Sequence, residues 1–219
     1  MSININQELN HWKEYISNHN KQYNSSNYYI TLIFEKYNSF YALNSFDNVS
    51  FCDFKANNIK KIPREYLLNE RKSSIQHWYS AVLKALFGIN YHKFYNYQPF
   101  GIGYLDEPSF KKHSPDQFHL HPGTEYPHAH ILLSVPETAT RASRTISIKD
   151  KFNQFIEDGT LEDLWRKTCP EGQFHITDCY EPFGALSYSA KTAKFDYQSY
   201  HADYQILLPY KKPKSVTFH

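Results

Sequence analysis

Two histidines separated by one residue are the sharpest chemical signal in the sequence. His128 and His130 flank Ala129, and the apolar residues 131–133 follow. Because side chains alternate between the two faces of a strand, both imidazoles would point the same way and could share one metal ion. Imidazole is a common ligand for Zn, Mn, Fe, Ni and Cu. In a chain with 12 histidines, a surface pair on an amphipathic strand would give the same pattern.

A segment with two acidic residues offers a third ligand. Within 100–107, the larger apolar side chains from Phe100 to Tyr104 share one parity. If that parity faces the core, Glu107 lies on the histidine-bearing face and Asp106 lies on the core side. Asp106 is the alternative ligand, because strand ends often twist or bulge. The other interpretation is that the acidic pair begins a solvated loop.

A tyrosine and a lysine at helical spacing form a second signal. Tyr188 and Lys191 are three residues apart, so they share one face of a helix. A phenol with a pKa of about 10 is a weak nucleophile at neutral pH, but a nearby metal ion or ammonium group can assist its attack on a phosphate. The structural alternative is one of 19 tyrosines packed on a helix beside a solvated lysine.

The hydrophobic pattern predicts the elements that position these residues. Strands are expected over 28–34, 97–107, 126–135 and 173–179, and helices over 8–17, 63–87, 147–159, from 160 onward and over 182–194. This order predicts an α+β fold of the split βαβ, ferredoxin-like type, with a central, mostly antiparallel sheet and helices on one face. The other face would be free to carry a site.

Length and composition limit the class of protein. The 219 residues fit one domain, 28–195, with an N-terminal extension, 1–27, and a tail, 196–219, that packs on or extends it. The net charge of +2 means that a nucleic-acid partner must be argued from local residues. We expect no membrane partner, because apolar runs are short and the N-terminus lacks a signal pattern. Three cysteines argue against a disulfide framework and fit a reducing cytoplasm.

Three motifs in this order resemble those of the HUH single-strand endonucleases, specifically the rolling-circle replication initiators of small plasmids and single-stranded DNA viruses. The first motif, an apolar strand with a Thr-Leu core, is matched by residues 29–34. The second, histidine–hydrophobic–histidine, is matched by residues 128–130. The third, a tyrosine three residues before a lysine on a later helix, is matched by Tyr188 and Lys191. The resemblance spans about residues 28–194.

The resemblance implies an enzyme that nicks and joins single-stranded DNA at a specific site and so initiates rolling-circle replication. Tyr188 would attack the scissile phosphate, form a 5′-phosphotyrosine link and free a 3′-hydroxyl. Lys191 would position the phosphate or stabilise charge near the phenolate. The covalent link conserves the energy of the phosphodiester, so resealing needs no nucleotide cofactor.

The same resemblance implies a cofactor and partners. The cofactor is a divalent metal ion, Mn²⁺ or Mg²⁺, held by His128, His130 and either Glu107 or, as the alternative, Asp106. The partners are single-stranded DNA or an origin hairpin, together with a separate host helicase and polymerase. A separate helicase is expected because the chain has no phosphate-binding-loop motif. The expected location is the bacterial cytoplasm or the host compartment in which DNA is replicated.

Two other classes of function fit the pattern. One is a non-catalytic protein that binds single-stranded nucleic acid on the same architecture, with histidines that bind no metal. The other is a related HUH enzyme, either a conjugative relaxase or a single-tyrosine transposase. Relaxases tend to carry a third histidine and place the tyrosine near the N-terminus, whereas here the tyrosine follows the histidines. Transposases share this order but are usually shorter.

Overall fold

The structure is a computed structural model that describes residues 5–34, 64–106, 127–141, 144–190 and 205–209. Two of the residues predicted to form the site, Glu107 and Lys191, lie outside these ranges. The other predicted site residues are all described.

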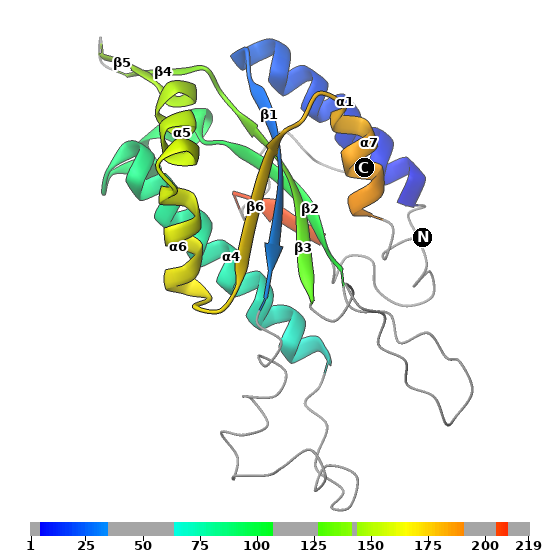
Figure 1. The fold of residues 1–219 in the computed structure, drawn as a ribbon. Coiled ribbons are helices and arrows are strands. Elements are labelled where there is room, and N and C mark those ends of the chain that lie inside the picture. The colour runs from blue at the N-terminus through cyan, green and yellow to red at the C-terminus, as the bar shows by residue number, and fades with distance from the viewer. Residues whose placement is uncertain (1–4, 35–63, 107–126, 142–143, 191–204, 210–219) are drawn as a thin grey trace, which may run out of the picture.

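A five-stranded antiparallel sheet forms the centre of the molecule (Figure 1). Its strands are β1 (Ser26–Ile33), β2 (Phe100–Asp106), β3 (His128–Val135), β6 (Gln173–Asp178) and β7 (Gln205–Leu208), in the order β6-β1-β3-β2-β7. All four neighbouring pairs are antiparallel. The strands are rich in β-branched and aromatic residues, which fit a pleated, buried surface. The predicted α+β class with a central antiparallel sheet is therefore confirmed.

Three helices cover one face of the sheet: α4 (Arg64–Phe87), α5 (Ile148–Glu157) and α6 (Thr160–Thr168). Their aromatic side chains meet this face in three contacts, with ring centroids 5.0–5.8 Å apart: Phe152 with Tyr28, Trp78 with Phe174, and Trp165 with Phe34. We call this side the core face. Ser147 caps α5, because its hydroxyl accepts a hydrogen bond from the Asp150 backbone N–H.

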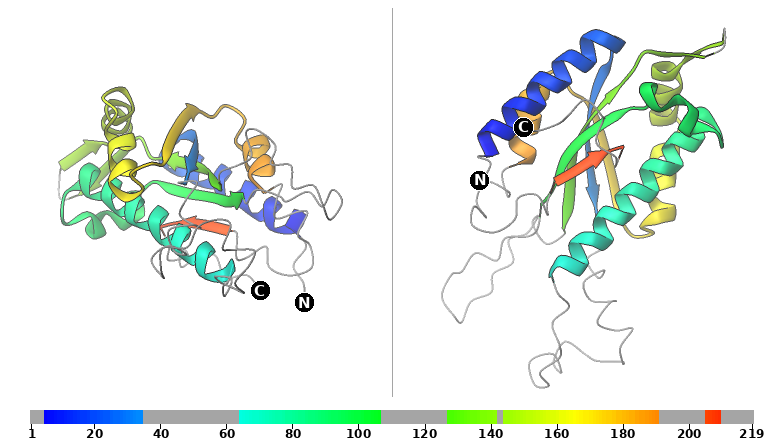
Figure 2. Two further views of the ribbon diagram at one scale, coloured as in Figure 1. Left: turned by 60° about the horizontal axis from the view of Figure 1, so that its bottom comes forward. Right: turned by 180° about the vertical axis from the view of Figure 1, so that it is seen from behind.

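Two helices lie on the opposite face, which we call the site face: α1 (Ile5–Tyr23) and α7 (Pro182–Ser189) (Figure 2). On α1, the ring of Tyr15 lies 4.6 Å from that of Phe100. The site face is therefore partly covered, whereas the sequence predicted helices on one face alone. Helix α1 packs into the core, since its Trp12 and Ile16 are each 1% exposed within the hydrophobic core cluster.

Short elements complete the fold. β4 (Thr138–Arg141) and β5 (Arg144–Ser147) form a two-stranded hairpin that the sequence did not predict, and a 3₁₀ helix, η1, spans Tyr91–Tyr97. β7 lies in the predicted tail and extends the sheet by pairing with β2. Gly159 separates α5 from α6 with a φ of 75°, a conformation that glycine adopts without strain. Within the described residues, every helix is too short or too polar to cross a membrane.

Candidate metal centre

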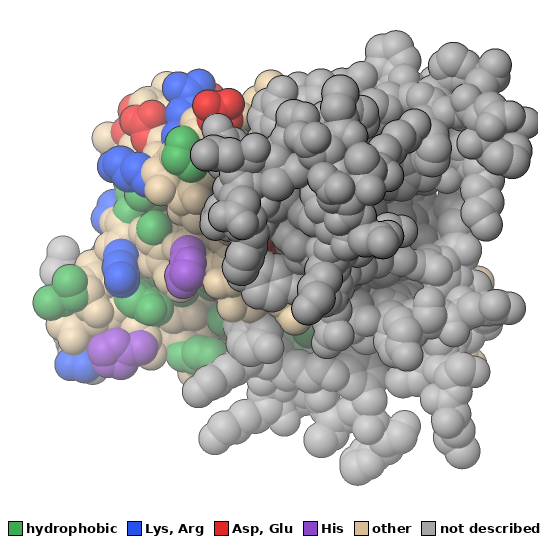
Figure 3. All heavy atoms as spheres, turned by 90° about the horizontal axis from the view of Figure 1, so that it is seen from below, with side chains coloured by type: hydrophobic (Ala, Val, Ile, Leu, Met, Phe, Trp, Pro, Cys, Tyr) green, Lys and Arg blue, Asp and Glu red, His purple; other side chains and the backbone are tan. Residues whose placement is uncertain are grey.

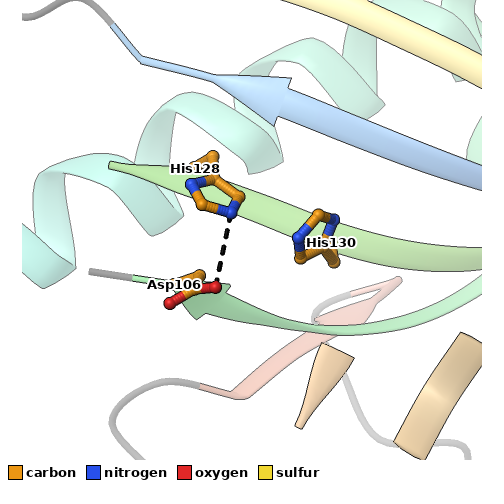
Figure 4. Close-up of side chains that lie close together, drawn as sticks. All are labelled: Asp106, His128 and His130. Atoms are coloured by element: carbon orange, nitrogen blue, oxygen red, sulfur yellow. Dashed lines mark ion pairs between the residues drawn. The ribbon is translucent and has the colours of Figure 1, made fainter. Parts of the chain in front are cut away.

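Two imidazoles and one carboxylate converge where β2 ends and β3 begins. Figure 4 shows Asp106, His128 and His130 grouped at these strand ends. One ligand atom from each residue lies within 4.8 Å of the other two. The closest pair is Asp106 Oδ2 and His128 Nε2, at 3.3 Å. Nitrogen and oxygen donors of this kind are the ones that bind divalent transition metals, so the residues present fit a metal ion.

Strand register explains why these three residues meet. Asp106 is the direct cross-strand partner of His128, and directly opposed residues share a face of the sheet. Side-chain alternation then places His130 on the same face. The antiparallel pairing of β2 with β3 is thus sufficient to build the group.

Asp106 lies beside the histidines, whereas the sequence placed it on the core side of its strand. That prediction assumed that the larger apolar side chains of β2 all face a single core. In the structure, Phe100 and the residues that alternate with it on β2 point to the site face, where Phe100 packs against α1. Asp106 shares this parity and is 7% exposed beside the histidines. Asp106, the alternative ligand, is therefore the acidic residue that the structure places in the group, while Glu107 lies outside the described residues.

A threonine on β1 orients one of the histidines. Thr31 is the cross-strand partner of His130, and its Oγ1 lies 3.1 Å from His130 Nδ1. A hydrogen bond at Nδ1 leaves Nε2 as the nitrogen for a metal, as in many protein sites whose ligating histidine is held by a second residue. The sequence singled out Thr31 as part of a motif without giving it a role. Strand alternation, which puts Thr31 on the outer side of 28–34, is the signal that could have done so.

Aromatic rings enclose His130 on the site face. Tyr29 is stacked on its ring at 5.4 Å between centroids, and Tyr188 meets the ring edge-on, also at 5.4 Å. The Ser189 hydroxyl lies 3.4 Å from the Tyr29 hydroxyl. Burial raises the pKa of Tyr29 to about 12, so Tyr29 is a neutral phenol at physiological pH. Tyr29 and Ser189 were not among the predicted site residues.

Tyr188 differs from Tyr29 in being accessible. Its side chain is 54% exposed, although its ring contacts the buried His130. α7 positions it by packing across β3 and β2, and Pro182 lies in the first turn of that helix. The structure therefore brings together His128, His130, Asp106 and Tyr188.

Charge on the described part of the surface in Figure 3 is mixed. In this view from below Figure 1, lysine and arginine side chains are interspersed with acidic, histidine and apolar ones. This distribution agrees with the small net charge of the chain.

No family model, curated protein or solved structure matches this chain. The function is therefore inferred from the geometry of the site and the chemistry of its residues.

Proposed function

We propose that the protein is a metal-dependent enzyme that nicks and rejoins single-stranded DNA through a tyrosine, as HUH replication initiators do. One observation carries the proposal: the accessible Tyr188 lies against His130, a member of the Asp106, His128 and His130 group. Phosphoryl transfer to a side chain requires a nucleophile that lies next to a metal site. The order of the motifs along the chain supports the same assignment.

Asp106, His128 and His130 would hold the metal ion. A divalent ion bound there would supply Lewis-acid stabilisation of the negative charge that develops on the phosphate during transfer. Two imidazoles among three ligands favour Mn²⁺ over Mg²⁺, which prefers oxygen ligands. Thr31 maintains the orientation of the His130 ring through the hydrogen bond at Nδ1.

Tyr188 provides the nucleophile. Its phenolic oxygen forms a bond to phosphorus while the bond from phosphorus to the 3′ oxygen of the preceding nucleotide breaks. The phenol loses its proton, and the leaving 3′ oxygen takes one up to become a 3′-hydroxyl. The product is a 5′-phosphotyrosine, and attack by a 3′-hydroxyl on that ester restores both the phosphodiester and the phenol. We assign Lys191, three residues further on, to hold the phosphate.

The proposed substrate is single-stranded DNA or an exposed loop of an origin hairpin, and the proposed role is initiation of rolling-circle replication. A helicase and a polymerase would come from the host, since the sequence contains no phosphate-binding-loop motif. Stacking of bases on aromatic residues suits a surface with interspersed charges, because it needs no large basic patch. The exposed ring of Tyr188 is one such aromatic residue.

Covalent capture tests this proposal without knowledge of the origin sequence. The protein is incubated with Mn²⁺ or Mg²⁺ and a pool of single-stranded oligonucleotides with a randomised segment. Adducts that survive denaturation are recovered, and the attached DNA is sequenced. We expect wild-type protein to form an adduct that proteolysis and mass spectrometry locate on Tyr188.

The matched variants are Tyr188→Phe and Tyr95→Phe, each of which removes one phenolic oxygen from an exposed tyrosine. Tyr188→Phe should abolish the adduct, and Tyr95→Phe should form it at the wild-type rate. An adduct on another tyrosine would show that Tyr188 is not the nucleophile. If wild-type protein binds single strands but forms no adduct with either metal, the non-catalytic binding protein becomes the better assignment.

A further inference from the structure

A second pocket lies at the end of the sheet opposite the metal centre. It is open, has a volume of about 590 Å³, and lies between α5 and the first residues of β1. Tyr28 in this pocket pairs with Asp178, whereas Ile33, five residues along the same strand, pairs with His128. Five residues of strand span about 17 Å, so the pocket is separate from the metal centre. Its volume is that of a typical small-ligand site.

The lining of the pocket is polar and carries more negative than positive charge. Its charged residues are Lys149, Glu157 and Asp178, and Ile156 supplies apolar surface. Two carboxylates against one ammonium group disfavour an anion such as phosphate. In the part of the chain that the structure describes, the group with metal-ligand spacing is the Asp106 cluster, so this pocket is not a second metal site. The lining suits an uncharged ligand with hydrogen-bond donors.

Hydrogen-bonding groups in the pocket are arranged for such a ligand. The Tyr28 hydroxyl donates to Asn153 Oδ1 at 2.5 Å, which leaves the amide NH₂ of Asn153 for a ligand acceptor. The exposed Asp178 carboxylate adds an acceptor.

An exposed aromatic ring stands beside these polar groups. Tyr180 lines the pocket and is 88% exposed. It lies two residues before Pro182, where α7 begins, so the chain leads directly from the pocket to the helix that carries Tyr188. A flat ring next to donors and acceptors is the combination that proteins use to stack and read an unpaired base.

We propose that this pocket binds one base of the single-stranded DNA substrate, stacked on Tyr180, and prefers bases with an exocyclic amino group. The inference depends on the proposed function for its substrate. Amino protons of cytosine, adenine or guanine would donate to the Asp178 carboxylate, whereas thymine offers a carbonyl in that position. Because the pocket is remote from the phosphate that Tyr188 attacks, it selects a base some nucleotides away from the cleaved bond.

Binding measurements with two pyrimidine oligonucleotides test this preference. Fluorescence anisotropy compares dC12 with dT12 in the presence of EDTA, so that the metal centre contributes nothing. We expect dC12 to bind about tenfold more tightly, as one good pair of hydrogen bonds to a base allows. Asp178→Asn should remove most of this preference, and Tyr180→Ala should weaken binding of both oligonucleotides at least fivefold. The matched controls are Asp163→Asn and Tyr95→Ala, whose side chains are exposed outside the pocket.

A thiol in the pocket gives an independent readout of occupancy. Cys179 lines the pocket and is partly exposed, whereas Cys169 is buried. Burial raises the pKa of the Cys179 thiol, so alkylation by N-ethylmaleimide is best followed at mildly alkaline pH. Bound dC12 should slow alkylation of Cys179, and dT12 at the same concentration should protect it less. Peptide mass spectrometry assigns the modified cysteine.

The outcomes separate this inference from the proposed catalysis. Equal affinities for dC12 and dT12, or alkylation of Cys179 unaffected by saturating dC12, would overturn the inference. If Tyr188 still forms its adduct in that case, the catalytic proposal stands alone. If Tyr188 forms no adduct but the preference for dC12 depends on Asp178, the pocket is a base-binding site in a non-catalytic protein. Circular dichroism of each variant verifies that the exposed substitutions leave the fold unchanged.

Discussion

The two faces of the sheet are built from the same strands but from different kinds of side chain. On β3, Ala129 and Ile131 point to the core face and are completely buried, whereas His128 and His130 point to the site face. On β1, Ile30 and Leu32 are likewise completely buried, while Thr31 between them hydrogen-bonds to a histidine. Alternation along these two strands thus places buried residues that stabilise the fold on one face and the candidate metal ligands on the other. Substitutions at adjacent residues of a strand should therefore affect either stability or metal binding.

The largest effect is expected on the site face. Replacing both His128 and His130 with alanine removes two of the three ligands, so Mn²⁺ binding and the Tyr188 adduct should both be lost. Isothermal titration calorimetry measures the first, and a denaturing gel measures the second. Mn²⁺ binding with unchanged affinity in the double variant would place the metal site elsewhere.

The adjacent residue on the core face should behave in the opposite way. Ile131 is 0% exposed, so Ile131→Ala should lower the free energy of unfolding by about 2–5 kcal/mol through lost burial and the cavity that remains. Metal affinity of the folded protein should stay within about twofold of wild type, because the histidines point to the other face. Urea denaturation with and without Mn²⁺ measures both quantities. A large loss of metal affinity would mean that the two faces are coupled.

Much of this division could be read from the sequence, and the exceptions have physical causes. The spacing of His128 and His130 indicates a shared face, and the helix with Tyr188 forms where Pro182 predicts its start. Asp106 was predicted on the wrong side of its strand because Trp12 and Tyr15 on α1 give the site face an apolar layer of its own. When both faces of a strand carry apolar side chains, the pattern of apolar residues does not show which face is the core.

Other features of the structure have too weak a pattern in the sequence to be predicted from it. Each strand of the β4–β5 hairpin has four residues, which is too short for a clear alternation of apolar and polar positions. The pocket beside α5 depends on the register of β1 with β6, which places Asp178 beside Tyr28. Register between strands distant in the sequence cannot be obtained from either strand alone.

A buried histidine on the site face should make the stability of the protein depend on pH. His19 on α1 packs among aromatic rings, and burial lowers its pKa from 6.5 to about 4. Because the folded-state pKa is depressed, the unfolded chain takes up the proton first as pH falls. Stability from neutral His19 is therefore complete above about pH 6.5 and is lost progressively towards pH 4, by about 3 kcal/mol in total.

His19→Phe should flatten this part of the pH profile. Thermal or urea unfolding from pH 7.5 to pH 4 measures the difference between the variant and wild type. His77→Phe, at an exposed position on α4, is the matched control and should keep the wild-type slope. An unchanged slope in His19→Phe would assign the acid sensitivity to other groups.

The smallest effect tests the side-chain link between β1 and β3. Thr31→Val replaces a hydroxyl with a methyl group of nearly the same size, so stability should change by less than about 1.5 kcal/mol. The hydrogen bond to His130 Nδ1 disappears, and the ring loses the contact that directs Nε2 to the metal. Metal affinity should fall about 10- to 100-fold, as it does when the residue that holds a ligating histidine is removed. Calorimetric titration with Mn²⁺ measures the change. Thr177→Val is the control, because Thr177 is an exposed threonine that pairs with Tyr29 and not with a histidine. Wild-type affinity in Thr31→Val would show that the neighbouring rings of Tyr29 and Tyr188 hold His130 without the hydroxyl.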